Sequence, residues 1–308
     1  MKYDAVVGFS VNAELELAVK DTPGPKKVLK RMDFCLSGSS GNVVMALKKL
    51  GSRPHLLGLV TARSQKTLAD KLLGEAIVQN KVSFTPIRVL SQSNICVIPV
   101  VGDTNGVLWG KRNQIVRSAI PKALRAIQRL GSGVGPNTFT VITGLRAVEV
   151  VFAKTLLEMT QTGFRVLNAK DTLCERMDFE RILPLVDLLV LNRYEFNETG
   201  MELSELHGFG RPKIIVVTDD EKGGMFSFHS GHKSHFKPVS FRGGRFETGA
   251  GDWFLGAMIS ELVRLRKSVD TVSLKEFQGV VDFAAKVAGK KITMPGGGNG
   301  PTRFQLRN

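Results

Sequence analysis

Short apolar runs alternate with helical patterns through much of this chain of 308 residues, and no other feature restricts the fold so strongly. The apolar runs are rich in Val, Ile and Leu, as is typical of strands buried on both faces; they cover residues 5–9, 56–60, 139–143, 165–167, 188–191 and 213–218. Helical patterns lie between them, at about residues 42–50, 64–79, 118–130, 147–161 and 175–184. The alternation predicts an α/β fold, a doubly wound and mainly parallel sheet with helices on both faces.

Two segments interrupt this alternation, residues 12–36 and 91–112, and both read as extended strands and turns without a helix. The second contains an Asn105-Gly106 turn between apolar residues, which is a typical hairpin signal. Because no linker or internal repeat is evident, we expect one domain over residues 1–308, with the two excursions paired in a small β lid. The same sheet would offer a surface for a homodimer.

Composition excludes several classes of protein. The apolar fraction of 43% and the charged fraction of 23% are ordinary for a globular chain, and no apolar run reaches the ~18 residues of a membrane span. The N-terminus reads as a strand and not as a signal peptide. Cys35, Cys96 and Cys174 are scattered without metal-ligand spacing, which argues against a zinc site and favours a reducing cytoplasm.

The net charge of +15 is spread over short clusters, and only two Trp and two Tyr are present for base stacking. We therefore interpret it as general solvated charge, helped by anionic substrates, and expect no specific nucleic-acid function. A dinucleotide-dependent oxidoreductase is set aside, because no Gly-x-Gly-x-x-Gly turn follows the first predicted strand.

The run Gly249-Ala250-Gly251-Asp252 is followed at once by an apolar pattern with helical spacing. Small residues let the chain turn tightly, so that backbone N–H groups point outward at the helix start, where the helix dipole favours an anion such as phosphate. A carboxylate beside a phosphate is unfavourable unless it has a function such as accepting a proton. The run is therefore either an anion site with a base or an ordinary strand-to-helix turn.

Polar or glycine-rich turns follow other predicted strands. Open α/β sheets bind ligands at the carboxyl ends of their strands, so these turns are candidate binding segments. They are Asn12 with Glu14, the loop from Gly38 to Asn42, Asn192 with Glu195, and the segment 218–224. Glu195 suits Mg²⁺ held through water, since this ion takes few carboxylates and keeps several waters. Each turn alone is ordinary, but their joint occurrence indicates a site.

In these motifs the chain resembles the phosphofructokinase-B, or ribokinase-like, family of carbohydrate and nucleoside kinases over nearly its whole length. The strongest match is the Gly-Ala-Gly-Asp run with Gly256 one turn further on. The loop from Gly38 to Asn42 and the pair Asn192 and Glu195 match next. The family fold is a doubly wound α/β domain with a β lid made from two excursions, which agrees with the interruptions described above.

The resemblance implies a role for each matching residue. Asp252 would be the catalytic base, and the amides of Ala250, Gly251 and Asp252, after Gly249, would form an anion hole. Asn192 and Glu195 would serve Mg²⁺ and the phosphates of ATP, with Glu195 binding the metal through water. Three further groups follow from the same resemblance: Thr218, Asp220 and Gly223 in the ATP loop; Ala285 beside the adenine; and Asn12, Glu14, Gly38 and Asn42 at the hydroxyls of a sugar.

The chain also departs from the family pattern. Phe246-Glu247 stand where the family carries an Asp-Thr pair that helps to form a monovalent-cation site, which puts activation by potassium in question. Asp220 stands at a position that is usually glycine. Glu14 replaces a shorter aspartate, and Ser39 replaces a lysine that ribokinases proper carry.

Basic residues stand near the expected acceptor site. Arg146 falls near the place of a sugar-binding carboxylate, and Lys111 and Arg112 belong to the predicted lid. They are either ordinary surface cations or contacts for an acceptor that carries a carboxylate or a phosphate. The segment 295–301, which holds four of the chain's glycines, reads as an exposed flexible turn, with closure over the nucleotide as the alternative.

We therefore predict an ATP-dependent kinase that transfers the γ-phosphate to a hydroxyl of a sugar or sugar derivative. A nucleoside kinase of the same family is the alternative, although the few aromatic residues of the substrate region, Phe9, Phe34 and Trp109, disfavour base stacking. A second alternative is a kinase-like binding or scaffold protein without catalysis. The departures at Phe246, Glu247 and Asp220 support that reading, and the retained Asp252 opposes it.

Overall fold

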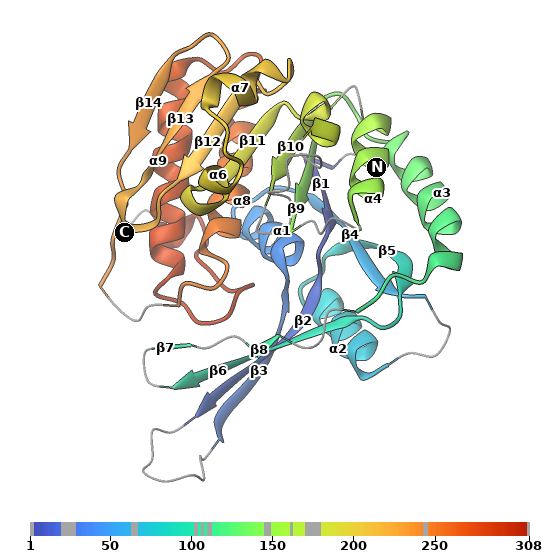
Figure 1. Ribbon diagram of the computed structural model, residues 1–308. Helices are drawn as coiled ribbons and strands as arrows, with labels where there is room; N and C mark the ends of the chain where they lie inside the picture. The colour runs from blue at the N-terminus through green and yellow to red at the C-terminus, as the bar shows by residue number, and fades with distance from the viewer. Residues whose placement is uncertain are drawn as a thin grey trace.

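The computed structural model describes residues 3–19, 29–62, 67–101, 104–105, 108–109, 113–144, 149–160, 163–169, 180–242 and 246–306. Within these residues the main sheet has nine strands in the order β14-β13-β12-β11-β10-β9-β1-β4-β5 (Figure 1). Their bounds are β1 (Ala5–Phe9), β4 (Pro54–Thr61), β5 (Ser83–Leu90), β9 (Phe139–Thr143), β10 (Phe164–Asn168), β11 (Leu188–Asn192), β12 (Ile214–Thr218), β13 (Gly224–Phe228) and β14 (Lys233–Phe236). All neighbours from β12 to β5 pair in parallel, and β13 and β14 add an antiparallel edge.

Helices cover both faces of this sheet, because successive residues of each buried strand point to opposite sides. Ile214 and Val216 of β12 belong to one core cluster, and Ile215 and Val217 belong to the other. The first cluster includes residues of α1 (Ser39–Lys49), α2 (Leu68–Gln79), α8 (Ala250–Leu265) and α9 (Leu274–Lys291). The second includes residues of α3 (Ile120–Gly131), α4 (Val150–Met159) and α7 (Leu203–Gly208), while the short α6 (Arg193–Glu198) follows β11.

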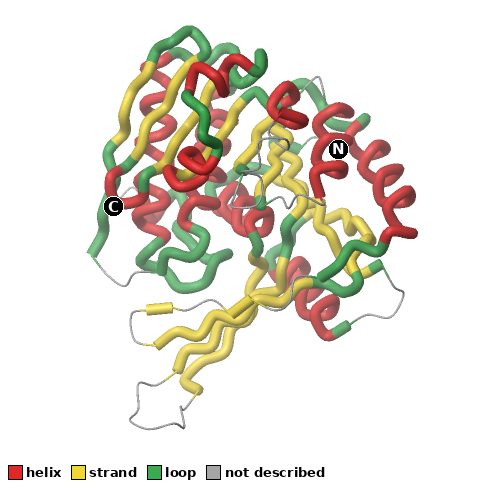
Figure 2. The backbone as a smooth tube through the Cα atoms, in the orientation of Figure 1, coloured by secondary structure: helices red, strands yellow, loops and turns green. Residues whose placement is uncertain are grey.

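The two excursions pair with each other in a second sheet, of order β3-β2-β6-β7, with β8 also paired to β6. Its strands are β2 (Asn12–Val19), β3 (Leu29–Ser37), β6 (Asn94–Val101), β7 (Thr104–Asn105) and β8 (Leu108–Trp109). In Figure 2 this sheet projects from the body of the molecule. The predicted fold class is therefore confirmed, and the action of the second sheet as a lid or a dimer surface stays a prediction. Gly106 of the predicted turn lies outside the described residues.

The sequence pattern did not predict three strands, β5, β13 and β14, of the main sheet. The strand β5 contains Pro86, which argues against a central strand but is tolerated here because β5 forms the edge of the sheet. The hairpin of β13 and β14 was missed because its segments GMFSF and KSHF are short and mixed in polarity. Of the helical pattern at 175–184, only the part from residue 180 onward lies among the described residues.

No helix in the described part of the chain is long and apolar enough to cross a membrane. The helices instead pack on the sheet and on one another. The helices α1 and α8 approach each other closely at Gly256, where an added Cβ would lie 2.6 Å from Ala46 Cβ and 3.1 Å from the Val43 carbonyl oxygen. Because glycine leaves room for this contact, the first turns of the two helices are held together.

We expect Gly256→Ala to lower the free energy of unfolding by about 1–3 kcal/mol, since the added methyl group overpacks the contact between α1 and α8. Urea denaturation followed by circular dichroism measures the change. Gly279→Ala in α9 is the matched control, because no atom lies within 4 Å of its added Cβ; it should raise the same free energy by up to about 1 kcal/mol. Equal effects of the two substitutions would contradict the packing argument.

Candidate active site

The first turn of α8 begins at Gly249, whose φ of 83° lies in the left-handed region that favours glycine. Space demands glycine as well, because an added Cβ would lie 2.9 Å from the Gly297 carbonyl oxygen and 3.1 Å from Asn42 Nδ2. The Ala250 N–H donates to the Glu247 carbonyl oxygen at 3.0 Å, so this amide of the predicted anion hole is already used.

Gly251 is the residue of this turn whose backbone a ligand can reach. The first N–H groups of a helix have no acceptor within the helix, and the Gly251 N–H has none among the residues that the structure describes. Gly251 is exposed, and no atom lies within 4 Å of the place where its Cβ would be. An anion can therefore approach this backbone closely, at the positive end of the helix dipole.

Asp252 is 3% exposed and lies beside α1. Its Oδ2 accepts a hydrogen bond of 2.9 Å from Asn42 Nδ2. Asn42 is held in turn by the start of α1, where its N–H donates to the Gly38 carbonyl oxygen at 2.8 Å, and Gly38 has a φ of 77°. The Ser40 N–H donates to the Ser10 carbonyl oxygen at 2.9 Å, which fastens this turn to the chain after β1.

Glu14 of the second sheet reaches the same region, and its side chain is 1% exposed. Its Oε1 accepts from the Gly297 N–H at 2.7 Å and from Cys35 Sγ at 3.2 Å, and its Oε2 accepts from Ser37 Oγ at 2.5 Å. The structure thus gathers Glu14, Asn42 and Gly249 around one glycine, Gly297, and Asn42 in turn bonds to Asp252. Asn12 is buried at the start of β2, opposite Ser37 of β3.

The segment 295–301, named the glycine loop below, lies inside this group. Gly296, Gly297, Gly298 and Gly300 are all buried, so the predicted exposed turn is wrong. The loop is buried because side chains distant in the sequence bond to it. The Gly297 carbonyl oxygen accepts from Trp253 Nε1 at 3.0 Å, and Lys49 Nζ donates to Asn299 Oδ1 at 3.0 Å.

Asn192 and Glu195 form a reciprocal cap at the start of α6. The Glu195 N–H donates to Asn192 Oδ1 at 2.7 Å, and the Asn192 N–H donates to Glu195 Oε2 at 2.9 Å. Asn192 Nδ2 also donates to Glu195 Oε1 at 2.9 Å. Among the described residues no three His, Cys, Asp or Glu side chains gather as a metal site. One fixed carboxylate of this kind suits Mg²⁺ that is bound mainly through water and phosphate oxygens.

The predicted ATP loop follows β12, and Thr218 pairs with Asn192 across the two neighbouring strand ends. Asp220 has a φ of 41°, which glycine adopts at no steric cost and aspartate does not. An added Cβ at Gly223 would lie 2.2 Å from the Phe236 carbonyl oxygen, so glycine is required there. Ala285 of α9 is 7% exposed and belongs to the first core cluster.

The side chain of Phe246, before α8, gives no support to a potassium site. Phe246 is 9% exposed and its apolar side chain offers no oxygen ligand; its N–H donates to the Ile292 carbonyl oxygen at 2.7 Å. Lys291 beside it is 0% exposed, and its ammonium donates to the Met294 carbonyl oxygen at 3.0 Å. Arg146, Lys111 and Arg112 lie outside the described residues.

Several residues of this edge were missed in the sequence. Asn168 ends β10 and its Oδ1 accepts from Thr143 Oγ1 of β9 at 3.4 Å, so both side chains stand at the carboxyl edge of the sheet. Asn168 follows an apolar strand, which is the same signal that pointed to Asn192. Ser37, Trp253 and Gly297 carried no such signal, because their contacts join segments that are distant in the chain.

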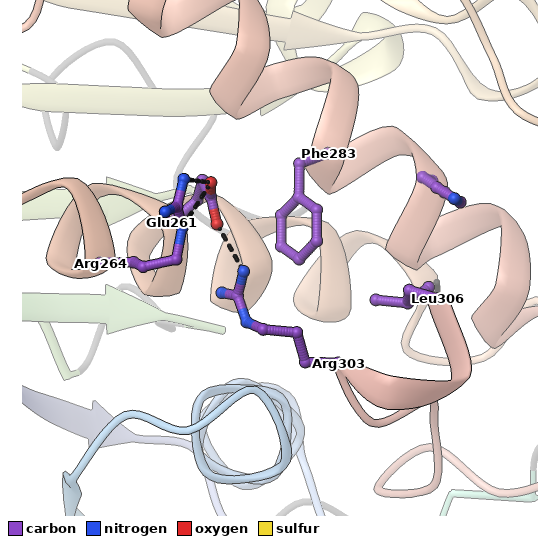
Figure 3. A pocket seen from close by; sticks show the side chains of 6 residues that line it. Glu261, Arg264, Phe283, Arg303 and Leu306 are labelled. Atoms are coloured by element: carbon purple, nitrogen blue, oxygen red, sulfur yellow. Dashed lines mark hydrogen bonds and ion pairs between the residues drawn. The ribbon is translucent and has the colours of Figure 1, made fainter. Parts of the chain in front are cut away.

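Two surface clefts lie away from this group of residues. One, of about 420 Å³, lies between α8, α9 and the turn near Arg303, where Arg264 and Arg303 both bond to Glu261 (Figure 3). Glu261 is roughly 13 Å along α8 from Asp252, at about 1.5 Å per residue. The other, of about 1330 Å³, includes Asp4 and Phe139 at the amino ends of their strands. Neither cleft is lined by the residues predicted for catalysis or binding.

Residues 2–303 match the model of a family described as pfkB family carbohydrate kinase. The chain therefore belongs to the pfkB family. Phosphofructokinase-2 from Escherichia coli in complex with potassium has a TM-score of 0.76 and 13% identity, over 100% of this chain and 97% of that chain. The ribokinase of Arabidopsis thaliana complexed with ribose and ATP has a TM-score of 0.70 and 17% identity, over 100% of this chain and 98% of that chain.

A nucleoside kinase from Methanocaldococcus jannaschii, an archaeal member of the ribokinase family, has a TM-score of 0.67 and 17% identity, over 99% of this chain and 97% of that chain. No curated protein matches the chain. At these identities the likeness to the solved structures shows the fold, and the family match confirms the resemblance predicted from the motifs.

We expect Asp220→Gly to raise the free energy of unfolding by up to about 1 kcal/mol, because glycine adopts the positive φ without strain. Lys222→Gly is the control in the same turn, where φ is not positive; it should lower that free energy by about 0.5–1 kcal/mol. Thermal or urea unfolding measures both. A loss of stability in Asp220→Gly would contradict the assignment of strain.

Cys96 of β6 lies opposite Glu14 of β2, and burial raises the pKa of its thiol to about 12, with the Glu14 carboxylate adding to the effect. An unfolded thiol, with the ordinary pKa of 9.0, loses its proton above that pH, while the folded thiol keeps it. The free energy of unfolding therefore falls as the pH rises from 9.0 towards about 12. At pH 9 we expect iodoacetamide to alkylate Cys96 roughly 10³-fold more slowly in the folded protein than in the unfolded one. Peptide mass spectrometry measures the rate, and similar rates in both states would contradict the burial argument.

Proposed function

We propose that this chain is an ATP-dependent kinase that transfers the γ-phosphate of ATP to a hydroxyl of a sugar or sugar derivative. One observation carries the proposal. The buried carboxylate of Asp252 is held by Asn42 at 2.9 Å, in the same helical turn as the open N–H of Gly251. A proton acceptor therefore stands next to a backbone site for an anion, as in-line phosphoryl transfer requires.

Asp252 would accept the proton of the acceptor hydroxyl as that oxygen attacks the γ-phosphorus, while the bond from this phosphorus to the β,γ-bridging oxygen breaks and ADP leaves. The hydrogen bond from Asn42 fixes the carboxylate, so its orientation does not depend on the substrate. The Gly251 N–H and the positive end of the α8 dipole would stabilise the charge that develops on the transferred group. The Ala250 N–H contributes only if it leaves the Glu247 carbonyl oxygen.

The nucleotide would lie at the ends of β11 and β12. Mg²⁺, when bound, neutralises phosphate charge, and Glu195 would hold it through water with Asn192 beside it. Thr218, Asp220 and Gly223 would line the phosphates, and Ala285 of α9 would lie beside the adenine. Asn12, Gly38 and Asn42 would face the acceptor. Potassium is not among the cofactors that we propose, since the side chain of Phe246 offers it no oxygen ligand.

A sugar is the acceptor that the family match favours, because the matched family is one of carbohydrate kinases. The nucleoside kinase remains the alternative acceptor class, since a nucleoside kinase is among the similar folds. The contact between Asn42 and Asp252 argues against a scaffold without catalysis, because a scaffold has no use for a fixed carboxylate beside an open helix terminus.

The test is ADP release from ATP and Mg²⁺ over a panel of sugars, sugar acids, sugar phosphates and nucleosides. We expect turnover with one class and a loss of about 10²–10⁴-fold in kcat in Asp252→Asn, because the amide cannot accept the proton. Binding of ATP, measured by calorimetry, should remain. Asp282→Asn on the exposed side of α9 is the matched control and should keep full activity. Normal turnover in Asp252→Asn would remove this residue from the role of base.

A further inference from the structure

The glycine loop is held at several points by residues of the candidate site. Its Gly297 N–H donates to Glu14 Oε1 at 2.7 Å, and its Gly297 carbonyl oxygen accepts from Trp253 Nε1 at 3.0 Å. Lys49 Nζ donates to Asn299 Oδ1 at 3.0 Å and to the Gly300 carbonyl oxygen at 3.3 Å. The loop is thus fastened to the second sheet, to α8 and to α1 at the same time.

The fit leaves no room for side chains. At Gly297 an added Cβ would lie 2.9 Å from both Glu14 Oε2 and Ser37 Oγ, and 3.1 Å from Asn42 Oδ1. At Gly298 it would lie 2.0 Å from the Leu36 carbonyl oxygen, and at Gly300 it would lie 2.7 Å from the ring of Trp253. Gly297 therefore fills the corner between Glu14, Ser37 and Asn42, where the resemblance expects acceptor hydroxyls.

The carboxylate of Glu14 is already occupied by its own chain. A carboxylate accepts about four hydrogen bonds, and Glu14 receives three, from the Gly297 N–H, Cys35 Sγ and Ser37 Oγ. With a side chain only 1% exposed, these donors replace the water that the charge has lost. Gly297 also covers Oε2, which lies 2.9 Å from the place of its Cβ. A substrate hydroxyl would therefore have to displace this glycine or one of the three donors to reach the remaining acceptor position.

We propose that Glu14 is a positioning residue and not an acceptor contact. Its carboxylate holds the glycine loop, through the Gly297 N–H, against Asn42, Gly249 and Trp253, so that the loop forms one wall of the acceptor pocket beside Asp252. The term acceptor pocket rests on the proposed function, while the attachment of the loop to Glu14 does not.

The contacts connect Glu14 to the base without touching substrate. Gly297 lies between Glu14 and Gly249, since the Gly297 carbonyl oxygen would be 2.9 Å from a Cβ at Gly249. Gly249 begins the turn that carries Asp252, and the Trp253 N–H donates to its carbonyl oxygen at 2.9 Å. Release of the loop from Glu14 would therefore loosen the start of α8, and kcat would fall more than the acceptor KM rises.

Side-chain length separates this role from a substrate contact. An aspartate at residue 14 is shorter by one methylene, about 1.5 Å, so its carboxylate cannot reach the Gly297 N–H from the same backbone. A glutamine keeps the length. Its amide oxygen accepts from the Gly297 N–H, and its amide nitrogen donates to Ser37 Oγ, since a hydroxyl both donates and accepts. Positioning therefore survives Glu14→Gln and is lost in Glu14→Asp.

Hydrogen exchange of the peptide that spans the glycine loop tests the attachment, and it requires neither a substrate nor activity. Loss of a hydrogen bond to a buried charge should raise exchange about tenfold or more in Glu14→Asp. Exchange in Glu14→Gln should stay within about threefold of the wild type. Asp282→Asn, on the exposed side of α9, is the control that should leave the loop unchanged. Equal exchange in Glu14→Asp and the wild type would overturn the proposal.

Kinetics with the acceptor from the panel give the second readout. We expect kcat to fall at least about tenfold in Glu14→Asp and to be restored within about threefold in Glu14→Gln. A direct substrate contact predicts the reverse: Glu14→Gln would raise the acceptor KM while loop exchange stayed normal, and this result would also overturn the proposal. If no acceptor is found, the proposed function is in question, and the exchange experiment still decides the role of Glu14.

Discussion

The close approach of α1 to α8 is the constraint on which the site depends. Gly256 allows it, because any Cβ there would press on Ala46 of the facing helix. The approach places the first turns of both helices side by side, where Asn42 and Asp252 share a buried hydrogen bond of 2.9 Å. The candidate base is thus oriented by the packing of the core, and the open amide of Gly251 shares its turn.

Buried charged side chains hold the backbone around the candidate site. Glu14 and Lys291 are both almost fully buried. Glu14 accepts from the Gly297 N–H in the glycine loop, and Lys291 donates to the Met294 carbonyl oxygen just after α9. A buried charged group needs such partners, since it has lost its hydration. The partner segment is rich in glycine because only a bare backbone fits between the second sheet, α1 and α8.

Local motifs of the site could be predicted because their physical causes lie within a few residues. The pair Asn192 and Glu195 forms a cap at a spacing of three residues, and Asp220 takes a left-handed φ that glycine adopts without strain. The edge strand β5 and the hairpin of β13 and β14 could not be predicted as easily. Pro86 argues against a strand at β5, and the segments of β13 and β14 are short and of mixed polarity. The sheet order places β5 at one edge of the sheet and the hairpin at the other, where such sequences are tolerated.

The sequence by itself determined the alternation of buried strands and helices, the two excursions, and the turn that begins α8, because hydrophobic period and glycine placement act over short distances. Only the tertiary structure decided what Glu14 binds and where the glycine loop lies. Gly297 and Glu14 are 283 residues apart. Glycine shows no preference for surface or interior until a neighbour occupies the space where its side chain would be, so a run that reads as an exposed turn becomes a buried wall.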